Sequence, residues 1–332
     1  MSSLTALSVV PPAGIATGLM RLTWSPQQTP DEQAFELIKA AIENGSTSLN
    51  SGFFYGNPPD VTTNLQLISR FCERYPELKD KFYLSVKGGI DEKMQPHADI
   101  DFLREQVQKI NAILKHRKMD LFEMARVDRQ AGIEQSMKNL ILLRDEGHFR
   151  DIGLSEVSAD SIRKAAAVGP VAAVEVEYSP FALDIEKNGV LAACRELNIP
   201  IIAYSPLGAG FLGNTWKSKD DIPEGDWRRN FDRFSDEHFE HNMQLVGKIT
   251  AIAEKKGVTS AQLSIAWVRS QWEGIVPLPG STNTERVKQA IAAGKIQLSS
   301  AELDEIRTVL DSFEVKGVRY AKNEHVQASL FA

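Results

Sequence analysis

Short apolar runs alternate along most of the chain with longer segments whose apolar residues recur at helical spacing. The short runs are apolar almost throughout, which is typical of parallel strands buried on both faces. We expect strands at 14–20, 47–50, 82–87, 120–126, 151–155, 172–178, 199–205 and 274–279. We expect helices at 31–44, 62–75, 101–115, 133–147, 158–168, 187–197, 242–256 and 284–293. About eight strand–helix units predict an α/β fold, the closed (β/α)8 TIM barrel. An open doubly wound sheet is disfavoured because it would use fewer strand–helix units per domain, and its usual GxGxxG turn does not follow the first predicted strand.

Residues that favour helix ends support these boundaries. Thr29-Pro30 offers an N-cap followed by a proline, and Gly45 and Gly257 stand just past predicted helices. The capping-box spacing recurs at Thr259…Gln262, Thr282…Glu285 and Ser299…Glu302. No Gly/Ser- or Pro-rich linker divides the 332 residues, so we expect one domain rather than two.

The length exceeds that of a typical barrel, which has about 250 residues. We place the barrel at about 14–298, with an extra helix at 299–312 and a C-terminal tail up to residue 332. The tail carries Arg319 and Tyr320. The surplus therefore predicts a lid and a pocket wall around one site.

Composition excludes several classes of protein. The chain has 38 Lys+Arg and 44 Asp+Glu, hence a net charge of -6, which argues against nucleic acid or an anionic membrane as the main partner. No apolar run reaches a membrane span of roughly 18 residues, and the first residues do not resemble a signal peptide. Cys72 and Cys194 lie in helix-like runs and predict reduced thiols. We expect a cytoplasmic protein, with the nucleus left open, and make no prediction of oligomeric state.

Candidate chemistry lies where strands end, because barrel active sites form at the carboxyl ends of strands. Lys87 ends the third predicted strand, and Tyr55 follows the second. A phenol has an ordinary pKa near 10, so it needs a neighbouring ammonium to work at pH 7. Tyr55 and Lys87 together suggest proton transfer. A lone strand-end lysine is, however, more often a surface or ion-pair residue.

Six segments, in this order, resemble the aldo-keto reductase family. They are LNSGFFYGN (49–57), FYLSVKGG (82–89), DIGLSE (151–156), VEVEYSP (174–180), IAYSPLGAGFLG (202–213) and VPLPGSTNTER (276–286). The resemblance covers about residues 14–315 and implies a (β/α)8 barrel that binds NADP(H) and reduces carbonyl compounds. Tyr55 and Lys87 match the catalytic Tyr and Lys of the family.

Two positions depart from the family's Asp–Tyr–Lys–His tetrad. Asn50 stands at the Asp position, and Ala125 stands at the His position. NSGFFYG and DLFEMARVD nevertheless resemble the fungal pyridoxal reductase branch of the family. This implies NADPH-dependent reduction of pyridoxal to pyridoxine, with Tyr55 as proton donor and Lys87 lowering its pKa. Trp24, Phe54 and Ala125 are expected to contact the small-molecule aldehyde.

Glu123 is a candidate replacement for the missing carboxylate. It stands two residues before Ala125, so both side chains face the same way on a strand. We hypothesise that Glu123 points into the barrel beside Lys87, where Asn50 brings no charge. The alternative is that Glu123 bonds to backbone or to a structural partner lower in the barrel.

The resemblance also assigns the cofactor-binding residues. Ser155, Glu156 and Glu175 match the nicotinamide carboxamide contacts, although the family usually has Asn and Gln at the last two. Tyr204 matches the tyrosine stacked on the nicotinamide ring, with a core aromatic as its alternative role. Arg286 can clamp a 2′-phosphate, which favours NADP(H) over NAD(H). The other expected contacts are Gly18 and Met20 at the ribose, Ser205, Leu207, Gly208 and Gly210 at the pyrophosphate, Ser281, Thr282 and Asn283 at a helix start, and Gln289 at the adenine.

The remaining features leave alternatives open. The aromatic and basic stretch 213–241 is interpreted as a lid over the pyrophosphate or as a solvated loop with a few packed aromatics. His238 and His241 lack a third ligand, so no metal is expected. An NADPH-dependent aldehyde reductase is favoured, with pyridoxal or another aldehyde as substrate. A non-catalytic NADPH-binding module and a Schiff-base aldolase using Lys87 are the alternatives.

Overall fold

Eight parallel strands form the centre of the molecule. The computed structural model describes residues 7–213, 215–319 and 329–332. Each strand pairs in parallel with the next one along the chain. The sheet closes because Ala16 N donates to Pro277 O at 3.0 Å and Gly18 N donates to Pro279 O at 2.9 Å. The strands are β1 (Thr17–Gly18), β2 (Ser48–Gly52), β3 (Tyr83–Gly88), β4 (Leu121–Met124), β5 (Asp151–Ser155), β6 (Ala173–Glu177), β7 (Ile201–Tyr204) and β8 (Ile275–Leu278). The predicted (β/α)8 barrel is confirmed.

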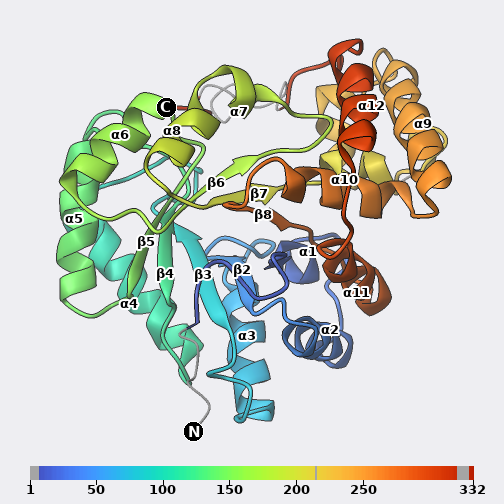
Figure 1. Cartoon of the computed structure of the whole chain (residues 1–332). Coiled ribbons are helices and arrows are strands. Elements are labelled where there is room, and N and C mark those ends of the chain that lie inside the picture. Colours follow the sequence, from blue (N-terminus) through green and yellow to red (C-terminus); the bar gives the residue numbers. More distant parts are fainter. Residues whose placement is uncertain (1–6, 214, 320–328) are drawn as a thin grey trace, which may run out of the picture.

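Helices surround the strands on the outside of the barrel (Figure 1). One main helix follows each strand: α2 (Asp31–Glu43), α3 (Thr63–Arg74), α4 (Ile100–Leu114), α5 (Ile133–Asp145), α6 (Ala159–Val168), α8 (Val190–Glu196), α10 (Ser260–Ser270) and, after the last strand, α11 (Thr284–Ala293). The additional α-helices of the described residues are α1 (Met20–Thr23), α7 (Asp184–Lys187), α9 (Phe239–Lys256) and α12 (Ser300–Asp311). The extra helix expected at 299–312 is α12, which packs against α9.

Several predicted boundaries need correction. The first strand is only two residues long, and Met20 begins α1 instead of ending that strand. The helix predicted at 187–197 is α8, which begins only at Val190 because Gly189, at φ 85°, lies in the left-handed region; the short α7 ends before it, at Lys187. The helix predicted at 242–256 begins earlier, at Phe239.

The helix caps follow the predictions in part. The capping boxes that begin at Thr259 and Ser299 are present. The N-cap of α2 is Pro30, not Thr29. Asn283 replaces the predicted Thr282 at the start of α11, because its side chain accepts from Arg286 N at 3.0 Å. An asparagine is as good a cap as a threonine, so residue types alone could not decide between neighbours.

The interior of the barrel changes from apolar to polar along the strands. Successive residues of a strand face opposite sides, so every second residue points into the barrel. Tyr83, Leu121 and Ala173 belong to one buried apolar cluster inside the lower part of the barrel. Two residues further along the same strands stand Ser85, Glu123 and Glu175, which are also buried. A polar layer therefore lies directly on the apolar one, below the carboxyl ends of the strands.

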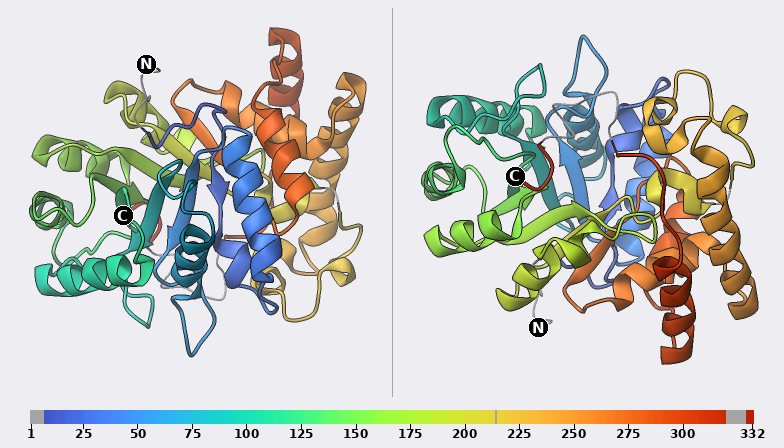
Figure 2. Two further views of the ribbon diagram at one scale, coloured as in Figure 1. Left: turned by 90° about the horizontal axis from the view of Figure 1, so that it is seen from below. Right: turned by 90° about the horizontal axis from the view of Figure 1, so that it is seen from above.

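Two segments near the end of the chain lie across these strand ends. Figure 2 shows the last residues, in red, beside β4 and β5. Arg126 Nε donates to Ser329 Oγ at 3.2 Å, and Ser158 N donates to Ala332 O at 2.9 Å. Arg319 is buried above β5 and β6, whereas Tyr320 lies outside the described residues. These contacts place part of the tail beside the expected pocket.

Neither cysteine forms a disulfide. Cys72 and Cys194 are both free and buried, and burial raises the pKa of their thiols to about 11 and about 12. Within the described ranges, no helix is both long and apolar enough to cross a membrane.

Candidate active site

Lys87 lies among buried polar side chains at the carboxyl end of β3. Its Nζ is 2.6 Å from Glu175 Oε1 on β6, and it donates to Asn50 Oδ1 on β2 at 2.9 Å. Asn50 Nδ2 in turn donates to Glu175 Oε2 at 2.7 Å. The three side chains thus form a closed hydrogen-bonded triangle. Asn50 orients both charged partners, while Glu175 supplies the negative charge that an Asp at position 50 would bring.

Glu123 is the fourth member of this cluster. Its Cα is in register with that of Lys87 on the neighbouring strand, and its Oε1 lies 3.6 Å from Lys87 Nζ. Its other oxygen accepts from Ser85 Oγ at 3.1 Å. Burial and the nearby Glu175 carboxylate raise the pKa of Glu123 to about 8, although Lys87 acts in the opposite direction. Glu123 therefore points to Lys87, as hypothesised, but Glu175 makes the shorter contact.

The charge balance explains how an ammonium can be buried here. Burial by itself would lower the pKa of Lys87, because it penalises the charged form. The carboxyl groups of Glu123 and Glu175 outweigh that effect and raise the pKa of Lys87 above its ordinary value. Lys87 consequently carries its proton throughout the physiological range.

Tyr55 lies above Lys87 in the loop after β2. Lys87 Nζ is 5.9 Å from the centre of the Tyr55 ring. Burial raises the pKa of Tyr55 to about 12, although the charge of Lys87 acts in the opposite direction. The expectation that Lys87 lowers this pKa describes its own contribution correctly, but burial decides the net direction. Tyr55 is therefore a neutral phenol at pH 7, which is the form that can donate a proton.

The backbone before Tyr55 leaves space for its ring. A Cβ at Gly52 would lie 2.9 Å from ring atoms of Tyr55, so a side chain there would displace the phenol. Trp24 stacks on Tyr55 with ring centres 5.7 Å apart, and Phe54 meets it edge-on at 5.2 Å. The expected substrate residues Trp24 and Phe54 thus lie directly beside Tyr55.

Two residues that the sequence did not single out hold this loop. Thr23 Oγ1 donates to Tyr55 O at 2.6 Å. Asn64 Nδ2 donates to Thr23 Oγ1 at 2.7 Å and to Leu19 O at 2.9 Å, while its Oδ1 accepts from Ser51 Oγ at 2.6 Å. Asn64 is fully buried in an apolar helix face, where an amide is costly unless hydrogen-bonded. An asparagine within that apolar pattern is the signal that could have identified it.

Ala125, at the position of the family's histidine, lies beside the C-terminal tail. Ala125 is buried directly after β4, and its N donates to Gly88 O at 2.9 Å. Arg126 Nη1 donates to Ala125 O at 2.5 Å, and Arg126 also contacts Ser329. Ala125 offers no polar atom to a carbonyl, so none of the hydrogen bonding of a histidine is reproduced at this position.

Two buried oxygens at the end of β5 lack partners. Ser155 Oγ and Glu156 Oε2 have no hydrogen-bond partner among the residues that the structure describes. A carboxamide offers one acceptor oxygen and an NH2 donor, which suit a hydroxyl and a carboxylate, respectively. These orphaned atoms therefore fit the amide of a nicotinamide ring. Glu175, assigned to the same amide from the sequence, has both oxygens engaged by Lys87 and Asn50.

The loop after β7 has the backbone geometry expected for a phosphate contact. Ser205, Gly208, Ala209 and Gly210 all have positive φ angles, so the loop turns tightly above the strand ends. Leu207 lies within this turn, where its O accepts from Gly210 N at 3.0 Å. Gly18, at the end of β1, approaches Gly280 through a backbone bridge, and Met20 follows in α1.

The stretch 213–241 covers this loop. Arg228 Nη1 donates to Ala209 O at 3.3 Å, and its guanidinium lies 4.6 Å from the ring centre of Trp216. A Cβ at Gly210 would lie 2.7 Å from Trp216. Residues 215–238 form turns and short 3-10 helices, and Phe234 stacks on Phe211 at 4.2 Å between ring centres. This arrangement favours the lid interpretation over a solvated loop.

The start of α11 presents the remaining expected contacts. Ser281 Oγ accepts from Asn283 N at 3.1 Å, and Thr282 O accepts from Gln33 Nε2 at 2.6 Å. Arg286 and Gln289 are exposed on the first turns of this helix. The exposed guanidinium at the positive end of the helix dipole is suited to a phosphate group.

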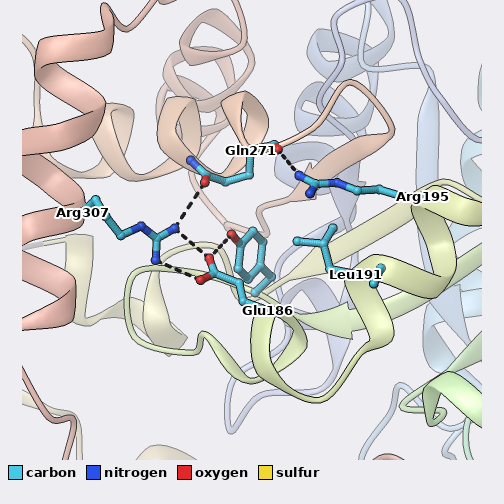
Figure 3. Close-up of a pocket in the computed structure, with 7 residues that line it drawn as sticks. Glu186, Leu191, Arg195, Gln271 and Arg307 are labelled. Carbon is cyan, nitrogen blue, oxygen red and sulfur yellow. Dashed lines mark hydrogen bonds and ion pairs between the residues drawn. The ribbon is translucent and has the colours of Figure 1, made fainter.

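A separate pocket lies on the outer side of the barrel (Figure 3). Its volume is about 300 Å³, and α8 and α12 contribute to its walls. Its polar groups bond to one another: Arg307 Nη1 lies 2.9 Å from Glu186 Oε2, Tyr178 Oη donates to Glu186 Oε1 at 2.6 Å, and Arg195 Nη2 donates to Gln271 O at 2.6 Å. None of the expected site residues lines it.

No group of three or more His, Cys, Asp and Glu residues is placed to hold a metal ion within the part of the chain that the structure covers. His238 instead lies 3.7 Å from Asp232, and His241 contacts Glu314 O at 2.8 Å.

Comparison with known proteins identifies the family. The model of the aldo/keto reductase family matches residues 14–311. A probable pyridoxal reductase 2 from Schizosaccharomyces pombe is 43% identical over 318 residues, covering 93% of this chain and 94% of that protein. An aldo-keto reductase of the same yeast, named yakc and described with NADP(+), is 37% identical and covers 94% and 92%, respectively. The chain belongs to the aldo/keto reductase family, as its motifs predicted.

The fold agrees with solved structures of the family. A glycerol dehydrogenase from Gluconobacter oxydans superposes with a TM-score of 0.80, covering 94% of this chain and 98% of that chain. Its sequence identity is 21%, so the likeness concerns the fold alone.

Proposed function

We propose that this protein is an NADPH-dependent aldehyde reductase that reduces pyridoxal to pyridoxine. The observation that carries this proposal is the buried contact of Lys87 with Glu175, 2.6 Å long, below the neutral phenol of Tyr55. It preserves an ion-paired lysine beside the tyrosine, although Asn50 and Ala125 replace two family residues. The relatives named for pyridoxal and for NADP(+) support the choice of substrate and cofactor.

The residues at the strand ends fit the cofactor. Ser155 and Glu156 would hold the carboxamide, the 205–210 loop the pyrophosphate, and Arg286 the 2′-phosphate. When bound, NADPH supplies a hydride from C4 of its nicotinamide ring. The protein must then place the aldehyde carbon over that position and deliver one proton to the aldehyde oxygen.

Tyr55 delivers that proton. Its hydroxyl is protonated at pH 7, and the ammonium of Lys87 stabilises the phenolate left behind. Glu175 and Asn50 keep Lys87 facing Tyr55 rather than solvent. The aromatic walls of Trp24 and Phe54 exclude water and suit the flat pyridine ring of the substrate. Because Ala125 cannot polarise the carbonyl, the site depends on a reactive aldehyde, and pyridoxal carries its own 3-hydroxyl beside the carbonyl.

The aldolase alternative conflicts with the charge of Lys87. A Schiff-base lysine must lose its proton to attack a carbonyl, and enzymes achieve this by lowering its pKa. Here the pKa of Lys87 is raised by Glu123 and Glu175. The amine is also held by its two hydrogen-bonding partners, so we do not propose this function.

The test follows NADPH absorbance with pyridoxal and with a panel of other aldehydes, and identifies the alcohol formed. We expect turnover of pyridoxal, and a loss of at least about 100-fold in Tyr55→Phe with unchanged NADPH binding. Turnover of other aldehydes but not of pyridoxal would refute the proposal that pyridoxal is the substrate. NADPH binding without any turnover would instead indicate a non-catalytic module.

A further inference from the structure

Arg319 connects the C-terminal tail to two expected nicotinamide contacts. Its Nη1 lies 3.0 Å from Glu156 Oε1 and 3.2 Å from Tyr204 Oη. Glu156 follows β5, and Tyr204 ends β7, so one nitrogen spans the end of the barrel between them. Only 5% of the Arg319 surface is exposed, and Glu156 is completely buried. The guanidinium of Arg319 is thus buried and held by two hydrogen bonds from one nitrogen, unlike an ion pair on the protein surface.

The rest of the Arg319 guanidinium is also engaged by carboxylates. Its Nε pairs with Glu177 Oε2 on β6, and its Nη2 lies 3.6 Å from Asp184 Oδ2. Arg233 brings a second positive charge, with Nη1 3.4 Å from Glu177 Oε1. Glu177 and Glu156 are further joined because Glu177 N donates to Glu156 Oε1 at 3.2 Å. Arg319 is the cation that both buried glutamates share.

We propose that Arg319 is a positioning residue for the nicotinamide end of the cofactor, and that it makes cofactor binding and docking of the tail mutually dependent. This inference rests on the proposed function, because it takes Glu156 and Tyr204 as nicotinamide contacts. Arg319 occupies one oxygen of Glu156, and the other, Oε2, has no hydrogen-bond partner among the described residues. It also holds the Tyr204 hydroxyl and so restricts where that side chain can lie.

Glu156 combines an unusual backbone conformation with a buried carboxylate, so its position depends on its contact with Arg319. Glu156 has a φ of 54°, in the left-handed region that residues with a side chain rarely adopt. Its N donates to Glu175 O at 3.0 Å, and its O accepts from Ala332 N at 3.3 Å. A carboxylate buried without a cation would be costly, so loss of Arg319 would favour a different position of Glu156.

The segment that carries Arg319 is itself attached to the lid. Val318 N donates to Asp232 Oδ2 at 3.0 Å, and Lys316 N donates to Asn242 Oδ1 at 2.9 Å. Asp232 belongs to the 213–241 stretch that covers the phosphate loop. Arg319 therefore joins the lid, the tail and the nicotinamide end in one contact network. If binding of the cofactor favours the docked tail, the docked tail must favour the cofactor by the same factor.

The test compares two ligands by fluorescence titration. NADPH reaches the nicotinamide end, whereas 2′,5′-ADP contains the adenine and 2′-phosphate but no nicotinamide. In Arg319→Met we expect the Kd of NADPH to rise about 10- to 100-fold, with the Kd of 2′,5′-ADP unchanged. Arg307→Met is the matched control, because Arg307 also pairs with a carboxylate, that of Glu186, but lies at the outer pocket, which none of the expected site residues lines. It should change neither constant.

Two further variants separate positioning from folding. Arg319→Met/Glu156→Gln should recover much of the NADPH affinity, because a neutral amide needs no cation and still offers an acceptor. Arg319→Lys keeps the charge with fewer contacts and should give an intermediate Kd. If Arg319→Met raised the Kd of both ligands equally, or if the double variant recovered no NADPH affinity, the proposed positioning role of Arg319 would be refuted.

Mutual dependence has its own readout. Hydrogen exchange over residues 315–319 should slow on NADPH addition in the wild type, and not in Glu156→Ala. Unchanged exchange in the wild type despite NADPH binding would overturn the coupling. These measurements use no aldehyde. If the protein bound NADPH but did not reduce pyridoxal, they would still test the role of Arg319. If the wild type bound no NADPH, the proposed function and this inference would both fall.

Discussion

Lys87 and Glu175 lie on strands β3 and β6 and meet inside the barrel, with 2.6 Å between Nζ and Oε1. The contact brings a carboxylate from far along the chain to a lysine whose usual partner position holds Asn50. Glu123 lies close enough to Lys87, at 3.6 Å, to act as a second carboxylate. The ammonium of Lys87 therefore makes one short ion pair, with Glu175, and one longer contact, with Glu123.

Because both glutamates contact Lys87, we expect substitutions of Glu123 and Glu175 to lower the free energy of unfolding non-additively. Glu123→Gln leaves Lys87 paired with Glu175, and Glu175→Gln leaves it beside Glu123, which ionises more readily once the neighbouring carboxylate is gone. The double variant leaves Lys87 without either carboxyl group. We expect the double variant to lose about 3–5 kcal/mol of unfolding free energy, more than the sum of the singles. Adding Lys87→Met should recover most of the loss, since it removes the uncompensated charge. Urea denaturation measures each step, and additive losses would contradict a shared partner.

A surface pair provides the control for those measurements. Lys164 and Asp160 are 2.7 Å apart but well exposed. Asp160→Asn should change the unfolding free energy by less than about 0.5 kcal/mol, because exposed ion pairs contribute little.

Glu123 predicts a pH dependence of stability. Its pKa is raised from 4.5 to about 8, so the folded protein holds a proton that the unfolded chain releases above pH 4.5. The stabilisation from this proton is complete below pH 4.5 and is lost as the pH rises through about 8, by up to about 1.4 kcal/mol per pH unit. Glu123→Gln should flatten the profile in this window. Identical profiles of both proteins between pH 5 and 9 would show that Glu123 does not titrate there.

Tyr55 predicts an asymmetry between the two directions of the reaction. With a pKa of about 12, its hydroxyl stays protonated well above neutral pH. Aldehyde reduction should therefore show no fall in kcat from Tyr55 between pH 7 and 10, whereas alcohol oxidation, which needs the phenolate, should accelerate with pH. Measuring both in Glu123→Gln as well separates any break near pH 8 that belongs to Glu123.

Gly210 provides a test of the loop proposed to contact the pyrophosphate. It has a φ of 113°, and an added Cβ would lie 2.7 Å from Trp216 and 3.1 Å from Arg228. Gly210→Ala should raise the KM for NADPH several-fold by displacing the lid, with a smaller effect on kcat. Gly213→Ala is the matched control, because nothing lies within 4 Å of a Cβ there in the described structure. Equal effects of the two substitutions would argue against the steric explanation.

Arg286 predicts the preference for the phosphorylated cofactor. Arg286→Met should raise the Kd of NADPH roughly tenfold and leave that of NADH unchanged, because only NADPH carries a 2′-phosphate. Lys288→Met, on the same helix, removes the same charge and should affect the two cofactors equally. The effect of Arg286→Met should shrink as salt is added. A parallel loss of NADH binding would show that Arg286 does not read the phosphate.

Local sequence patterns determined the barrel and the strand ends at which the candidate site lies. Apolar runs of strand length alternate with helical periodicity, and this pattern depends on neighbouring residues alone, so it could be recognised without coordinates. Tyr55, Lys87 and Glu123 could be placed because strand ends and side-chain parity follow from the same pattern. The break at Gly189 and the cap at Asn283 were missed because several nearby residues suit those positions.

The partners of the buried charges were decided by the tertiary structure. Glu175 reaches Lys87, and Arg319 reaches Glu156 and Tyr204, only because barrel closure and strand register bring distant residues to one layer. The net pKa of Tyr55 also depends on burial, which no local pattern contains. Sequence patterns specify which way a side chain faces along its own strand. Which charges meet across the barrel depends on how all eight strands are aligned.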